Sequence, residues 1–296
     1  MDERERDWLV QRFEERRPRL RAVAYRMLGS LAEAEEAVQD AWLRLSQGGV
    51  DGVENLDGWL TTIVGRVCLN LLRARRLRTN EASPVHLPDP VVKCDGNRDP
   101  EQATSLADSV GLALLVVLDT LEPAERLAFV LHDMFDLPFE EIGPLVDRSP
   151  AATRQLASRA RRRVRRSAPQ EPDQDVARQR EVVDAFFAAA HDGNFDALIA
   201  VLDPDVVLRT DGGSARPKLT TILRGQTAVA QRAQAFARQP ALRRPVLVNG
   251  AAGVVVMVGD SPFSVMGFTV VAGKIVEINT IADPERLQTL NVAMQS

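Results

Sequence analysis

The spacing of apolar residues changes once along this 296-residue chain, and that change constrains the fold more than any other feature. Up to about residue 166 the apolar residues recur three or four positions apart, as they do on one face of a helix. After about residue 206 short runs rich in β-branched residues alternate with polar ones, which is typical of strands. A chain of this length holds two or three domains. We therefore expect helical modules followed by an α+β domain.

Three helices are predicted before residue 80. Apolar periodicity from Trp8 to Leu45 is interrupted at Gly29-Ser30, which indicates a helical hairpin. Ser30 and Glu33 have the spacing of a capping box at the start of the second helix. A third helix is expected from about Asp57 to Leu77, with most of its arginines outside the apolar stripe. That stripe consists of Trp59, Leu60, Ile63, Val67 and Leu71, and we expect Trp59 to pack in the core.

Prolines interrupt the pattern between about Thr79 and Ala103, which predicts a linker. Four further helices are then expected, over residues 106–121, 124–134, 137–146 and 148–166. The last two have the features of a helix-turn-helix: an apolar scaffold face, a turn at Asp147-Arg148, and Ser149-Pro150 at the start of the second helix. Pro144 should shorten or kink the scaffold helix. The scaffold face consists of Phe139, Ile142 and Leu145. The second helix is expected to bury Thr153, Leu156, Ala160 and Val164. Its exposed side is expected to hold Ala151, Arg154, Gln155, Ser158, Arg159 and Arg162.

A second linker is predicted from Ser167 to Asp175, and the remaining chain mixes helices with strands. Gly273-Lys274 is a hairpin signal, whereas Asp203-Pro-Asp205 and Asp211-Gly-Gly213 are expected to be turns. These features indicate an α+β domain built on a curved sheet. Helices are expected over 176–191, 195–201 and 226–238, and strands over 206–209, 245–248, 253–258, 268–271 and 275–281.

Charge is distributed unevenly along the chain. The net charge of −4 would by itself argue against a nucleic-acid partner. However, the segment from Thr61 to Asn80 holds five arginines and no acid, and the segment from Arg148 to Arg166 holds eight arginines and no acid. Two basic helices in an otherwise acidic chain are typical of two separate DNA contacts.

Several functional classes are disfavoured by the same composition. No apolar run approaches the roughly 20 residues that span a bilayer, and the charged N-terminus is unlike a signal peptide, so we expect a cytoplasmic protein without membrane contact. Cys68 and Cys94 have no CxxC or Cys/His spacing, which predicts neither a disulfide framework nor a metal site. We also expect no catalytic residue set and no cofactor.

Two parts of the chain resemble a known family. RAVAYRMLGS (21–30), AEAEEAVQDAWLRL (32–45) and WLTTIVGRVCLNLLRARR (59–76) resemble region 2 of extracytoplasmic-function (group 4) sigma factors, and residues 121–164 resemble region 4. Residues 182–213 are similar to SnoaL-like domains, which have the NTF2-like cone fold. This combination is typical of the ECF41 subgroup, the SigJ-like proteins. It implies a multidomain protein. Residues 1–80 would form an all-α sigma domain and residues 105–167 a second one, a four-helix helix-turn-helix module. Residues 81–104 and 168–175 would be linkers, and residues 176–296 would form an α+β SnoaL-like regulatory domain.

The resemblance implies binding rather than catalysis. The partners would be core RNA polymerase, through its β′ clamp helices and β flap, and promoter DNA. An acidic and polar helix face would meet the basic clamp helices, the third helix would face the −10 element, and the recognition helix would read the −35 element with base and phosphate contacts. The residues that would contact polymerase are Glu36, Gln39 and Asp40. The residues that would contact the −10 element are Asn55, Arg66, Asn70, Arg73 and Arg76, and the loop at 53–56 that contains Asn55 could capture melted bases. The residues that would contact the −35 element are Arg154, Gln155, Ser158, Arg159 and Arg162.

Three short signatures of the subgroup occur here as variants. A WLPEP-type element appears as HLPDP (86–90), a DGGGK element as DGGSA (211–215), and an NPDKL element as DPERL (283–287). By resemblance, the tail would touch the first linker through these elements and so regulate the sigma modules. The residues expected to make these regulatory contacts are Leu87, Pro88, Asp211, Gly212, Gly213, Asp283, Pro284 and Leu287.

Two alternatives from other classes stay open. One is a helix-turn-helix regulator that does not replace sigma, although such a protein would not need the AEAEEAVQD segment. The other is a SnoaL-like enzyme tethered to DNA, because such folds enclose an apolar pocket and some use an Asp or His as acid and base. Asp203, Asp205, Asp211, Asp260 and His191 are the candidates, but no two form a recognisable catalytic pair. Because such folds enclose a pocket, a small-molecule ligand of unknown nature also stays open for this domain.

Overall fold

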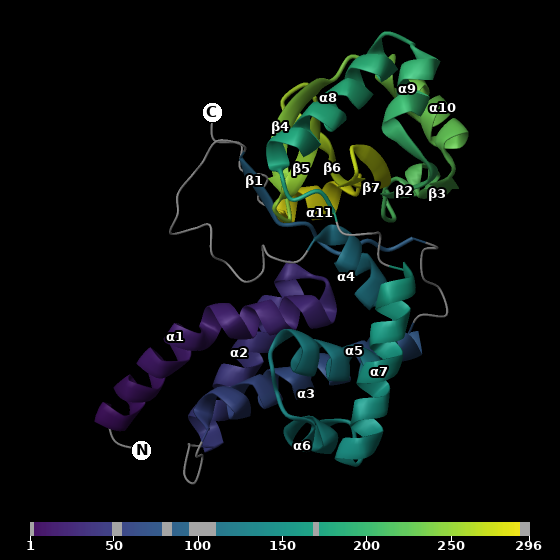
Figure 1. Ribbon diagram of the computed structural model, residues 1–296. Coiled ribbons are helices and arrows are strands. Elements are labelled where there is room, and N and C mark those ends of the chain that lie inside the picture. Colours follow the sequence, from purple (N-terminus) through teal and green to yellow (C-terminus); the bar gives the residue numbers. More distant parts are fainter. Residues whose placement is uncertain (1–2, 49–54, 79–84, 95–110, 168–171, 291–296) are drawn as a thin grey trace. The chain divides into compact units, whose positions relative to one another are not determined.

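The computed structural model describes residues 3–48, 55–78, 85–94, 111–167 and 172–290 (Figure 1). The chain forms two compact units. Unit 1 comprises residues 1–81, 104–107 and 114–167, and unit 2 comprises residues 82–103, 108–113 and 168–296. Residues 85–94, between the two predicted helical modules, therefore cluster with the C-terminal part of the chain.

Unit 1 begins with the predicted helical hairpin. It consists of α1 (Glu3–Leu28) and α2 (Leu31–Gly48), joined at Gly29, whose φ of 70° is readily adopted by glycine. The Glu33 amide lies 3.5 Å from Ser30 Oγ, at the limit of a weak cap. The third helix, α3 (Leu56–Arg78), packs against both.

The buried face of α3 is wider than the predicted stripe. Trp59, Ile63 and Leu71 are only half-buried, so the expectation of a core tryptophan is wrong. The reason is that α3 packs against α1 and α2 on one side and against α5 on the other. A helix covered from two directions cannot be read as a single stripe. Its buried apolar residues are Leu60, Val64, Val67, Cys68, Leu69 and Leu72.

The second helical group contains shorter pieces than predicted. It comprises α4 (Leu112–Asp119), α5 (Pro123–Phe129) continued by the π-helical turn η2 (Val130–Met134), α6 (Phe139–Ile142) continued by the 3₁₀ turn η3 (Gly143–Leu145), and α7 (Pro150–Ser167). The scaffold helix stops at Ile142 because Pro144 cannot continue an α-helix, as predicted. Ser149 begins α7, with the Ala152 amide 3.3 Å from its hydroxyl.

Unit 2 is built on one seven-stranded sheet with the order β1-β4-β5-β6-β7-β2-β3. All neighbours are antiparallel except β2 and β7, which are parallel. The hairpin at Ala272-Gly273 has both residues at positive φ, 48° and 73°, as a two-residue β-turn requires. The strands are β1 (Val92–Cys94), β2 (Leu202–Asp211), β3 (Thr221–Arg224), β4 (Leu242–Val248), β5 (Ala251–Val258), β6 (Ser261–Val271) and β7 (Lys274–Ile281).

Helices α8 (Val176–His191), α9 (Phe195–Val201) and α10 (Gln226–Ala237) pack on the sheet and complete its main core (Figure 1). Phe186 of α8 meets Phe268 of β6 edge-on, with ring centroids 6.0 Å apart. A short 3₁₀ turn, η4 (Pro217–Leu219), precedes β3, and α11 (Pro284–Thr289) follows β7. The predicted fold class, helical modules with a C-terminal α+β domain, is confirmed.

Sequence patterns missed three elements and misjudged one. β1, β3 and α11 were not expected, since each is too short to show a period. Asp203-Pro-Asp205, expected to be a turn, instead lies inside β2, where the pairing with β7 shifts register between Leu202 and Val207. This irregular pairing accommodates the proline, which cannot donate a ladder hydrogen bond.

Candidate functional sites

The exposed side of α7 carries most of the residues predicted to meet the −35 element. Arg154, Gln155, Arg159 and Arg162 are exposed, whereas Ser158 is half-buried. On the opposite side Thr153 and Ala160 are buried as predicted. The predicted burial of Leu156 and Val164 is only partial, and Ala157 is fully buried instead. The buried side of α7 is therefore made of small residues, which allow α5 and α6 to approach closely.

Two of the α7 arginines are oriented by contacts within unit 1. The Arg154 guanidinium lies over the Phe139 ring of α6, 5.2 Å from its centroid. Arg159 Nε donates to Glu125 Oε1 at 2.9 Å, and that carboxylate is largely buried. Arg154 thus stands at the helix-turn-helix junction, while Arg159 also ties α7 to α5.

On α3, Arg66, Asn70 and Arg73 are exposed at spacings of four and three, so they share one face of the helix. Arg76 is also exposed but forms an ion pair with Glu122. Asn55 caps α3, since the Gly58 amide donates to its side-chain oxygen at 3.0 Å. Residues 53 and 54 of the predicted base-capturing loop lie outside the described residues.

The predicted polymerase-binding residues lie together on α2. Glu36, Gln39 and Asp40 are exposed, and they share one side of the helix because Gln39 and Asp40 follow Glu36 by three and four positions. The preceding Glu35 is engaged instead in ion pairs with Arg17 and Arg21 of α1. The exposed acidic surface is therefore the part of α2 that points away from the hairpin partner.

A buried arginine that sequence reasoning missed joins the two helical groups of unit 1. Arg126 of α5 is only 2% exposed; its Nε donates to the Arg26 carbonyl of α1 at 3.0 Å and its Nη1 to Asp119 Oδ1 at 2.9 Å. Burial lowers the pKa of Arg126, and burial also lowers the pKa of Arg26 to about 10. Nothing in the amphipathic pattern distinguishes Arg126 from an ordinary surface arginine.

In unit 2 the two predicted regulatory elements of the tail meet each other. Gly213 has a φ of 59°, and a Cβ on it would collide with the Asp283 carboxylate. A Cβ on Gly212 would collide with the Arg216 carbonyl oxygen. Only glycine fits at both positions. Asp283 caps α11 by accepting from the Glu285 amide at 3.0 Å, Pro284 is the first residue of α11, and Leu287 is buried.

Leu87 and Asp89 of the first linker lie against this part of the tail, which we call the linker cradle (Asp211, Gly212, Gly213, Asp283 and Arg286). Leu87 and Pro88 are buried, and the Leu87 amide donates to Asp211 Oδ2 at 3.0 Å. Beyond the cradle the Val91 amide donates to Asn249 Oδ1 at 3.1 Å, and β1 pairs with β4 at the sheet edge.

Arg286 is the centre of the cradle and was not among the predicted site residues. Its guanidinium donates to Asp211 Oδ2 at 2.8 Å, to Asp89 Oδ1 at 2.9 and 2.6 Å, and to the Leu87 carbonyl at 2.6 Å. The signal was present in the sequence as opposite charges in two signature variants, Asp89 in HLPDP and Arg286 in DPERL. Only the fold shows that they are neighbours.

Among the described residues no group of three or more His, Cys, Asp or Glu side chains is placed to hold a metal ion. None of the helices within the described ranges is both long and apolar enough to cross a membrane.

Comparison with known proteins identifies the family of the helical modules. Residues 12–78 match the family described as Sigma-70 region 2, and residues 111–164 match Sigma-70, region 4. The ECF RNA polymerase sigma factor SigJ of Mycobacterium tuberculosis is 36% identical over 290 residues, covering 94% of this chain and 92% of that protein. A probable ECF RNA polymerase sigma factor, SigI of M. tuberculosis, is 33% identical and covers 92% of each chain.

A solved structure extends the similarity to three dimensions. The crystal structure of M. tuberculosis SigJ matches with a TM-score of 0.72 and 32% identity, over 94% of this chain and 98% of that one. The match therefore includes the C-terminal α+β domain as well as the helical modules. This chain belongs to the extracytoplasmic-function RNA polymerase sigma factors.

Proposed function

We propose that this sigma factor binds core RNA polymerase through the exposed acidic side of α2 and directs it to promoters through α3 at the −10 element and α7 at the −35 element. The observation that supports this assignment most is the placement of the predicted residues on three separate exposed helix faces. A solvated face that served only solubility would have no reason to concentrate acids on α2 and arginines on α3 and α7.

The two arginine faces contribute affinity and specificity differently. Arg66, Arg73 and Arg162 would neutralise phosphates, which makes affinity depend steeply on salt but not on sequence. Arg154 and Gln155, near the N-terminal end of α7, are placed as base-reading side chains are in helix-turn-helix proteins. Asn70 would add a hydrogen bond to a base or to the backbone of the −10 element.

We propose further that the C-terminal domain modulates transcription by holding the first linker in the cradle. The linker connects the segments that carry α3 and α7, so its docking restricts how far these two DNA-binding helices can move apart. Support comes from Arg286 and Asp211, which bind Leu87 and Asp89 with four hydrogen bonds.

Run-off transcription with core polymerase tests both parts, on promoters recovered by binding to genomic DNA. Substituting Glu36, Gln39 and Asp40 by alanine should abolish transcription while leaving binding to isolated promoter DNA unchanged. Removing the whole tail after residue 175, or only the residues after 281, should give different transcription outputs, because the second truncation removes Arg286 but keeps Asp211. Transcription by the α2 variant would refute the polymerase assignment, and equal outputs from the truncations would refute the regulatory one.

A further inference from the structure

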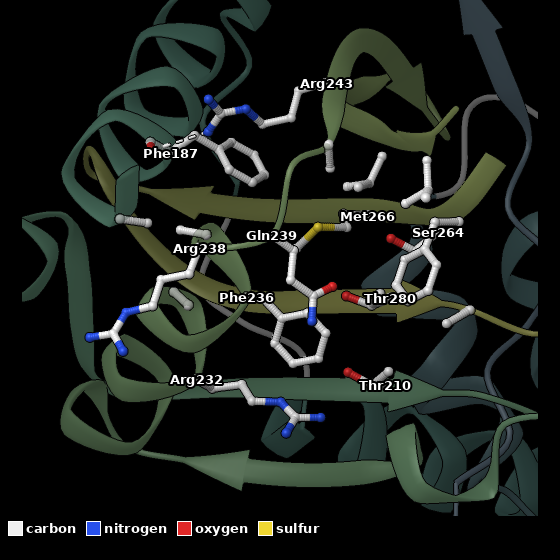
Figure 2. Close-up of a pocket in the computed structure, with 18 of the residues that line it drawn as sticks. Phe187, Thr210, Arg232, Phe236, Arg238, Gln239, Arg243, Ser264, Met266 and Thr280 are labelled. Carbon is white, nitrogen blue, oxygen red and sulfur yellow. Dashed lines mark hydrogen bonds between the residues drawn. The ribbon is translucent and has the colours of Figure 1, made fainter. Parts of the chain in front are cut away.

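The C-terminal domain contains a cavity that the proposed function does not use. It lies between α8, α10 and the helix-facing side of the sheet, and its volume is about 380 Å³ (Figure 2). Phe186, Phe187, Phe236 and Met266 contribute to its mainly apolar wall. A cavity of this size and lining is within the range of sites that bind small molecules.

One polar group at the cavity has no protein partner. The Thr280 hydroxyl is buried, and no described residue makes a hydrogen bond to it. Thr280 of β7 lies beside Thr210 of β2 in register, and both line the cavity. An unpaired buried hydroxyl costs free energy, and a ligand with a polar group would supply the missing partner.

The charged side chains that line the cavity are all basic. Arg232, Arg238 and Arg243 line the cavity, and among the described lining residues there is no Asp or Glu. Figure 2 shows the Arg232 side chain running beneath Phe236 toward Thr210, whereas Arg238 points away from the cavity. Arg243 is held by a hydrogen bond to the Phe187 carbonyl, 3.2 Å long. The Arg232 guanidinium lies 4.5 Å from the Phe236 ring centroid, so Arg232 is the lining cation that runs toward the two threonines.

The same lining favours binding over turnover. His191 is the one residue among the described lining residues with a carboxylate, imidazole or thiol side chain, and it is exposed at the surface. A general acid–base mechanism usually pairs two such groups, and the cavity does not bring two together.

We propose that this cavity binds a small monocarboxylic acid with an apolar body, its carboxylate held by Arg232 and Thr280 and its tail or ring packed among the phenylalanines. A neutral or cationic molecule of the same shape would leave Arg232 without a counter-charge.

The cavity shares two strands with the linker cradle. Thr210 directly precedes Asp211 on β2, and two residues after Thr280 the Ala282 amide donates to the Asp211 carbonyl at 2.7 Å. Arg216 also connects them, since its Nη1 donates to the carbonyls of Ala282 and Phe263, each at 2.9 Å. If the proposed function is correct, the bound acid alters linker docking and so acts as an effector of transcription.

Calorimetric titration of the full-length protein with decanoate, decan-1-ol and decylamine tests the site without polymerase or DNA. We expect saturable one-to-one binding of decanoate, at least about tenfold tighter than that of the alcohol or the amine. No saturable binding of any probe, or equal affinity for decanoate and decan-1-ol, would overturn the proposal.

Three variants locate the carboxylate. Thr280→Val and Arg232→Gln should each weaken decanoate binding about tenfold, and the matched control Arg238→Gln should not. Thr280→Val should not lower the melting temperature of the ligand-free protein, because it removes a hydroxyl that has no partner in the described structure. Unchanged affinity of Thr280→Val and Arg232→Gln, or equal loss in Arg238→Gln, would reject this placement.

The effector role has a separate readout. Decanoate should change run-off transcription by the wild type but not by Thr280→Val. Saturable binding without any change in transcription would reject the effector role alone, while the proposed sigma activity would be judged by transcription in the absence of ligand.

Discussion

Arg286 is the residue on which linker docking should depend most. Substituting it by methionine keeps the length of the side chain and removes its four hydrogen bonds to Asp89, Asp211 and Leu87. It also leaves the nearly buried Asp211 carboxylate, 4% exposed, without its cation. Removing one partner of a buried ion pair costs about 3 to 5 kcal/mol. Because the Arg286 side chain is 18% exposed, the lower end of that range applies, about 3 kcal/mol, which corresponds to roughly a hundredfold change in the docking equilibrium.

Amide hydrogen exchange measures this equilibrium residue by residue. The Leu87 and Val91 amides donate to the side chains of Asp211 and Asn249 only while the linker is docked. In Arg286→Met both amides should exchange about a hundredfold faster, and Val91 is the more telling because it does not contact the cradle itself. Amides in the centre of the sheet, such as Val255 in β5, should be unaffected.

The matched control is Arg224→Met, which removes an exposed arginine from β3 and should change none of these rates. Unchanged exchange at Leu87 and Val91 in Arg286→Met would refute the reasoning. So would uniform acceleration across the sheet, because Arg286 would then stabilise the whole domain rather than the docked linker.

Three further predictions concern other parts of the chain. Gly213→Ala should lower the free energy of unfolding by at least about 1 kcal/mol more than Gly193→Ala does in chemical denaturation, since both residues have positive φ but only Gly213 lies against another side chain; equal losses would mean that the contact with Asp283 is unimportant. Arg154→Ala should lose about 1 to 3 kcal/mol of binding to −35 DNA relative to scrambled DNA in competition assays, and equal weakening on both would reassign it to a phosphate. Burial raises the pKa of the Cys68 thiol to about 12, so that at pH 8 its reactive thiolate is scarce; iodoacetamide should modify only Cys94 in the native protein and both cysteines in urea, and native labelling of Cys68 would contradict its burial.

Local features of the sequence determined much of this protein. Helix boundaries at Ser30 and Ser149, the short scaffold helix at Pro144, and the hairpin at Gly273 follow from capping, ring geometry and backbone freedom, which act within a few residues. The exposure of Arg66 and Arg154 followed from helical periodicity. The order of the motifs was enough to indicate the sigma family.

Only the tertiary structure shows the contacts between residues that lie far apart in the chain. Trp59 was misjudged because α3 is covered from two directions, and Arg126 was missed because a buried arginine looks like a surface one until its partners are known. Likewise, Asp89 and Arg286 are separated by 197 positions, and no periodicity links residues at that distance. Burial and ion pairing depend on what covers a side chain, so the linker cradle, the unpaired Thr280 hydroxyl and the arginine-lined cavity could be found only in the folded chain.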